Sequence, residues 1–195
     1  GWKYYDCGLN PYLQKGSVRS RRNFKRPSWD GRQLKGQTLL VWREQGLGDE
    51  IELSTCLNDL VDIDGRVIYE CDPRLVGLYS RAFPQFTVRP ETINPDGSSG
   101  INDFDKQCAI GSLHKYFRKN LADYQGKELR FSPMPEWHEE FKSRLSPYFG
   151  KKLVGICWRS QKLTIERNLN YSGLQDWKSL LSRPDLQFVN LQYGE

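Results

Sequence analysis

The sequence has few of the residues that most often carry chemistry at enzyme active sites. Its 195 residues include two histidines, His114 and His138, and a single methionine, Met134. The five cysteines lie 15 to 49 residues apart and form no C-x-x-C pair. Structural zinc sites use closely spaced ligand pairs, so we expect no bound metal. We also expect no cofactor.

The chain also lacks long apolar segments. No apolar run approaches the roughly 18 residues that a membrane span requires, and residues 1–6 contain no apolar signal-peptide core. Three of the five cysteines lie in apolar segments, where cysteine behaves as a small hydrophobic residue, which favours a reducing, cytoplasmic setting. Because the only methionine is Met134, we expect a processed chain or a piece of a longer protein.

Positive charge is concentrated at the start of the chain, whose overall net charge is +5. Residues 1–35 hold nine basic and two acidic residues, a net charge of +7, so the remainder carries −2. The basic run at 19–26 could bind nucleic acid or phosphate, or it could be a solvated connector that faces another domain. We favour the connector because the run is short, and we expect no nucleic-acid partner.

From residue 37 onward, signals for strands and helices alternate. Short apolar runs predict strands at 38–42, 66–71, 86–89 and 104–110, and apolar residues at helical spacing predict helices at about 49–61, 72–82 and 112–119. Alternation of this kind predicts an α/β fold, a Rossmann-like parallel sheet with helices on both faces.

A second unit of the same type begins near the end of the sequence. A helix is predicted at 135–145, and after the break at Pro147 and Gly150 an apolar run at 153–158 predicts a new strand. A polar loop, a helix at about 173–183 and a strand at 186–191 follow it. We therefore predict a basic arm or connector at 1–36, a Rossmann-like domain at 37–146 and the truncated start of a second such domain at 147–195.

The glycine-rich segment E-Q-G-L-G-D at 44–49 follows the first predicted strand, where open parallel sheets bind their ligands. Gln45, Gly46 and Gly48 are candidate ligand contacts, and Asp49 is a candidate general base or, alternatively, a helix N-cap. The G-x-G-x-x-G pattern of nicotinamide-dinucleotide sites is incomplete because Ile51 replaces its third glycine, although Glu70 stands where a ribose-binding acid would lie. A nicotinamide-binding domain therefore remains one alternative.

A second candidate site follows the strand at 153–158. Ser160, Lys162 and Arg167 offer a hydroxyl group and two positive charges, a set that suits a diphosphate. The alternative is a solvated polar loop.

Several segments together carry a family resemblance. They are P-S-W-D-G at 27–31, L-K-G-Q-T-L-L-V at 34–41, E-Q-G-L-G-D at 44–49, F-D at 104–105, V-G-I-C-W-R-S at 154–160 and F-V-N-L-Q at 188–192. They resemble the glycosyltransferase-like domain that follows tetratricopeptide repeats in many bacterial proteins, a relative of the heptosyltransferases of glycosyltransferase family nine.

The resemblance implies a GT-B architecture, in which two Rossmann-like domains face each other. The first binds mainly the acceptor and the second mainly a nucleotide-sugar donor. It implies inverting, metal-independent sugar transfer to an acceptor hydroxyl, with Asp49 as the base. The donor diphosphate would be held by Ser160, Lys162 or Arg167, and tetratricopeptide repeats would precede the chain. Because the chain stops early in the donor domain, it can be catalytically incomplete, and a non-catalytic interaction or scaffold module is the main alternative.

Overall fold

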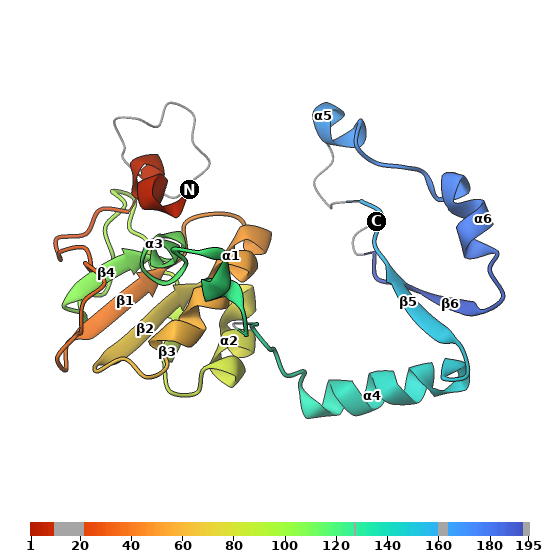
Figure 1. The fold of residues 1–195 in the computed structure, drawn as a ribbon, viewed down its shortest axis with the longest axis horizontal. Coiled ribbons are helices and arrows are strands. Elements are labelled where there is room, and N and C mark those ends of the chain that lie inside the picture. Colours follow the sequence, from red (N-terminus) through yellow and green to blue (C-terminus); the bar gives the residue numbers. More distant parts are fainter. Residues whose placement is uncertain (10–21, 127, 160–163, 193–195) are drawn as a thin grey trace. The chain divides into compact units, whose positions relative to one another are not determined.

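The computed structural model describes residues 1–9, 22–126, 128–159 and 164–192, with the backbone alone at 166 and 167. The chain divides into two compact units, Gly1–Ser132 and Pro133–Glu195 (Figure 1). The division falls before the helix at 135–145, which was expected to belong to the first domain, and the N-terminal residues 1–9 lie in the first unit.

The first unit is built on a four-stranded parallel sheet (Figure 1). Its strands lie in the order β3-β2-β1-β4. The central strand β1 coincides with the apolar run at 38–42 and is buried along its whole length, as a strand covered on both faces should be. The strands are β1 (Thr38–Trp42), β2 (Arg66–Cys71), β3 (Thr87–Pro90) and β4 (Lys106–Ala109).

Each predicted helix of the first unit forms near its expected place, but with part of its length as 3-10 helix. Asp72 is the N-cap of η3 (Pro73–Leu75), and its side chain accepts a hydrogen bond from the Arg74 backbone N–H at 3.0 Å. No helix in the described part of the chain is both long and apolar enough to cross a membrane. The helices are η1 (Trp2–Leu9), α1 (Leu47–Leu53), η2 (Ser54–Leu60), η3 (Pro73–Leu75), α2 (Val76–Ala82), η4 (Ile110–Leu113), α3 (His114–Phe117) and η5 (Leu121–Tyr124).

The two faces of the sheet are covered differently. Side chains of α1, η2, α2 and η4 pack on one face, together with Leu39 and Val41 of β1. Helices were expected on both faces, but the second face is covered mainly by the loop residues Phe24 and Phe104, together with Leu9 at the end of the 3-10 helix η1. The reason is that residues 91–105, which connect β3 to β4 across the sheet, form no helix.

The second unit pairs two parallel strands in the predicted strand–helix–strand order. No side chain in its described part is buried. Its elements are α4 (Pro135–Leu145), η6 (Ser146–Tyr148), β5 (Lys152–Ile156), α5 (Ile165–Asn168), η7 (Leu174–Trp177), α6 (Lys178–Leu181) and β6 (Leu186–Asn190).

Candidate functional site

The glycine turn, residues 44–49, connects the carboxyl end of β1 to α1. Gly46 is the N-cap of α1 with extended backbone angles, and neither Gly46 nor Gly48 has a positive φ. A Cβ atom added to Gly48 would meet no atom within 4 Å. Neither the backbone conformation nor the packing of the described residues therefore requires glycine at position 48, and the turn has open space beside it.

Asp49 lies in the first turn of α1 with its side chain exposed. Its carboxylate reaches back toward the start of the helix, since a Cβ atom on Gly46 would lie 3.1 Å from Oδ2. Because Gly46 holds the N-cap position, the alternative interpretation of Asp49 as the N-cap is wrong. The carboxylate faces solvent rather than packed side chains.

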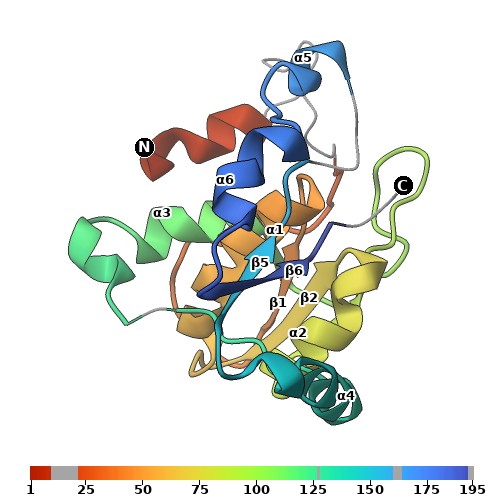
Figure 2. The ribbon, with the colours of Figure 1, turned by 90° about the vertical axis from the view of Figure 1, so that its right-hand side faces the viewer.

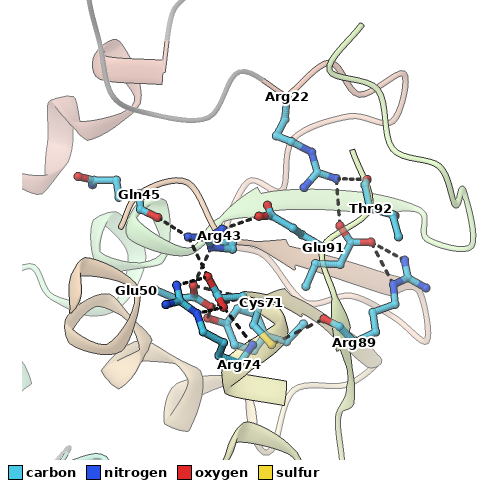
Figure 3. A network of polar contacts seen from close by, with 12 residues as sticks. Arg22, Arg43, Gln45, Glu50, Cys71, Arg74, Arg89, Glu91 and Thr92 are labelled. Carbon is cyan, nitrogen blue, oxygen red and sulfur yellow. Dashed lines mark hydrogen bonds and ion pairs between the residues drawn. The ribbon is translucent and has the colours of Figure 1, made fainter. Parts of the chain in front are cut away.

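Arg43 joins the glycine turn to a buried network of polar contacts (Figure 3). Its Nε donates to Glu50 at 2.8 Å, its Nη2 donates to the backbone oxygen of Gln45 at 2.8 Å, and its Nη1 forms an ion pair with Glu91. One guanidinium group thereby fixes the beginning of the turn to the helix that follows it.

Glu50 is the buried centre of this network. It accepts hydrogen bonds from the Tyr69 hydroxyl at 2.9 Å and from the Asp72 backbone N–H at 3.2 Å. Burial raises the pKa of Glu50, although these contacts and Arg43 favour its charged form. Hydrogen bonds from Arg74 lower the pKa of Asp72 to about 2. The network ties the carboxyl ends of β1 and β2 together beneath the glycine turn.

Two further contacts hold the turn against the β4 side of the sheet. The buried Glu44 accepts a hydrogen bond from the Gly111 backbone N–H at 3.0 Å, just after β4. The side-chain Nε2 of Gln45 donates to the hydroxyl of Tyr5, on η1, at 2.7 Å. The described structure thus brings Gln45, Gly46, Gly48 and Asp49 together on one supported turn.

Glu70, the candidate ribose-binding acid, is engaged in ion pairs instead. Its fully buried carboxylate accepts hydrogen bonds from Arg22 and from Arg89, each at 3.0 Å and on different oxygens (Figure 3). Both oxygens are therefore occupied, which counts against the nicotinamide alternative. Arg22, from the basic run at 19–26, neutralises a buried acid with a side chain that is itself fully buried, so at this position the run is packed rather than solvated.

A cavity of about 380 Å³ lies beside the carboxyl ends of β1 and β4. Its walls include Trp42 and Gln107, whose polar groups are already joined, with Trp42 Nε1 donating to Gln107 Oε1 at 2.7 Å. Neither Gln45 nor Asp49 lines this cavity. Among the described residues no three His, Cys, Asp or Glu side chains are grouped so that they could hold a metal ion.

The predicted diphosphate loop follows β5. Ser160 and Lys162 lie outside the described residues, and Arg167 lies in α5 without a described side chain. The start of the loop is fixed by Gln192, whose Oε1 accepts a hydrogen bond from the Arg159 backbone N–H at 3.2 Å. The assignment of this loop to a diphosphate stays a prediction.

Sequence inspection missed three residues that support the glycine turn. Glu50 lies three residues before Leu53, so it is a charged residue next to the apolar stripe of the helix, and that mismatch could have been noticed. Arg43 is a cation placed directly after a buried strand, a weaker signal. Tyr5 has no local signal, because its contact with Gln45 joins residues 40 positions apart.

Comparison with known proteins links the chain to a bacterial protein. No family model matches the chain, and no solved structure matches it at a significant level. Protein FlbA of Caulobacter vibrioides is 30% identical to it over 207 aligned positions, which cover the whole chain and 34% of FlbA. The chain is thus similar to FlbA and spans about a third of the length of that protein.

Proposed function

We propose that the chain is part of an inverting GT-B glycosyltransferase, which transfers a sugar from a nucleotide-sugar donor to an acceptor hydroxyl. The observation that carries the proposal is the exposed carboxylate of Asp49 beside the open space at Gly48, on a turn held by a buried network. The parallel sheet supports it, because ligands of such sheets bind beyond the carboxyl ends of the strands. The family resemblance supplies the chemistry.

In the proposed reaction Asp49 accepts the proton of the acceptor hydroxyl. The acceptor oxygen forms a bond to the anomeric carbon while the bond from that carbon to the phosphate oxygen breaks. The nucleoside diphosphate leaves with the electron pair, and attack from the opposite side inverts the anomeric centre. No metal ion takes part. The resemblance assigns Ser160, Lys162 and Arg167 to the diphosphate, and tetratricopeptide repeats to the preceding part of the protein.

Replacing Asp49 tests the proposal in the full-length protein. Asp49→Asn removes the base and keeps the size of the side chain, so kcat should fall by about 10² to 10⁴ while donor binding is retained. Glu52→Gln is the matched control, because Glu52 is an exposed carboxylate on the same helix. Transfer would be measured as incorporation of labelled sugar from UDP-, GDP- and ADP-sugars into an extract of the source organism.

The outcomes separate the alternatives. If Asp49→Asn transfers sugar at the wild-type rate, Asp49 is not the base. If the wild-type protein neither binds nor transfers any nucleotide sugar, the enzymatic proposal is overturned and an interaction module is favoured. A rise in melting temperature with NAD would instead favour the nicotinamide alternative.

A further inference from the structure

Gln45 is held from two sides. Its backbone oxygen accepts a hydrogen bond from Arg43 Nη2 at 2.8 Å, and its side-chain Nε2 donates to the Tyr5 hydroxyl at 2.7 Å. The first contact comes from the residue that follows β1, and the second comes from η1. The glycine turn is therefore fixed to the sheet and also to the N-terminal helix.

Tyr5 is itself fixed in place. Its ring lies so close to Gly111 that a Cβ atom there would fall 2.2 Å from it. The neighbouring Asp6 accepts a hydrogen bond from the Ser112 hydroxyl at 2.6 Å and pairs with Lys115. The hydroxyl of Tyr5 thus has a defined position relative to the carboxyl end of β4.

The other atom of the Gln45 amide is available. In the described part of the chain Oε1 of Gln45 forms no hydrogen bond, and the residue is half-buried. The amide group is planar, so a hydrogen bond that anchors Nε2 also sets the direction of Oε1. Oε1 can therefore accept a hydrogen bond from a hydroxyl group of a ligand. Gln45 lies four residues before Asp49 in the sequence.

We propose that Tyr5 is a positioning residue of the acceptor site. It orients the amide of Gln45 so that Oε1 accepts a hydrogen bond from a second hydroxyl of the acceptor, next to the hydroxyl that Asp49 deprotonates. The inference rests on the proposed function and deepens it in two ways. It defines the acceptor as a molecule with neighbouring hydroxyl groups, and it makes the N-terminal helix part of the site.

Tyr5→Phe in the full-length protein removes one hydroxyl and keeps the ring against Gly111. Tyr4→Phe is the matched control, because the Tyr4 side chain is 66% exposed on the same helix. With Tyr5→Phe the KM for the acceptor should rise about threefold to tenfold, as expected for one neutral hydrogen bond, and kcat should change by less than about twofold. Backbone hydrogen exchange at residues 45–49, measured without substrate, should become faster, and the melting temperature should stay close to that of the wild type.

A double-mutant cycle distinguishes positioning from a general structural role. In a Gln45→Ala background Tyr5→Phe should have no further effect on the acceptor KM, because the group that Tyr5 orients is gone. An equal effect of Tyr5→Phe in both backgrounds, or unchanged exchange and KM in the single variant, would overturn the proposal. If the wild-type protein transfers no sugar, the proposed function fails, while the exchange measurement still decides whether Tyr5 holds the turn.

Discussion

Three glycines of the first unit differ in the space that their neighbours leave for a side chain. A Cβ atom on Gly65 would lie 2.5 Å from the backbone oxygen of Gln37, and one on Gly111 would collide with Tyr5. A Cβ atom on Gly48 would have no neighbour within 4 Å. The first two glycines are explained by packing of the protein itself, whereas no packing among the described residues explains Gly48.

Gly48→Ala should therefore separate stability from activity. Alanine inside α1 should raise the free energy of unfolding by about 0.5–1 kcal/mol, because glycine loses more backbone conformational freedom than alanine when the chain folds. The added methyl group occupies the space in which the acceptor would approach Asp49, so sugar transfer should fall. Thermal unfolding and transfer assays on the same samples test both parts. A variant that is more stable and fully active would show that no ligand approaches Gly48.

The sequence predicted the position of the glycine turn but not what supports it. A buried strand followed by glycines and an acid is a local pattern, and Asp49 was selected as a candidate base on that pattern. Arg43 and Glu50 act through contacts with Glu91, Tyr69 and Asp72, which come from other elements. Such contacts depend on the folded chain and leave little trace in the local pattern.

At the level of elements, the strands were the easiest to predict. β1 and β2 coincide with their apolar runs because parallel strands buried on both faces need continuous apolar sequence. β4 is shorter than predicted at Lys106–Ala109, since Phe104 instead packs on the second face of the sheet. The helix η1 was not predicted, because residues 2–9 lack a clear apolar period.

The helix η1 packs against the buried His114. The ring of Trp2 contacts that of His114 in a tilted arrangement with 4.2 Å between centroids, and η1 lies beside α3 in both ribbon views (Figures 1 and 2). Burial lowers the pKa of His114 to about 4, with a further contribution from Arg118, while Asp59 acts in the opposite direction.

This pKa makes the first unit less stable in mild acid. Below a pH of about 6.5 histidine in the unfolded chain binds a proton, whereas folded His114 stays neutral until the pH approaches 4. The unfolded state then binds more protons, so the free energy of unfolding should fall as the pH drops from about 6.5 to about 4. Urea unfolding at several pH values, followed by tryptophan fluorescence, measures this fall.

His114→Phe should reduce the pH dependence, because phenylalanine keeps a ring under Trp2 and cannot bind a proton. Replacement of His138, which lies in the second unit, is the control and should leave the pH dependence of the first unit as it is. An identical fall in stability for wild type and His114→Phe would assign the effect to other groups.

At the level of the whole molecule, the buried apolar side chains are confined to one unit. Among the described residues they all lie between Trp29 and Leu113. The second unit leaves Trp137, Phe141 and Phe149 about half exposed, and its sheet has two strands. Parallel sheets need cover on both faces, and two strands without a core are marginal at best.

We predict that the two units differ in their ability to fold alone. A fragment of residues 1–132 should unfold in one cooperative transition, because it contains the whole described core. A fragment of residues 133–195 should show no cooperative transition and weak chemical-shift dispersion in NMR spectra. A sharp thermal transition of the second fragment would contradict this expectation.

The buried pair of Arg22 and Glu70 bears on how the protein should be shortened for experiments. A version that starts at the first sheet strand would look reasonable on a fold diagram, yet it would leave one of the two arginine partners of a fully enclosed carboxylate behind. Loss of a counter-charge in such a place typically costs about 3–5 kcal/mol. Expression boundaries should therefore be drawn ahead of the basic run rather than after it.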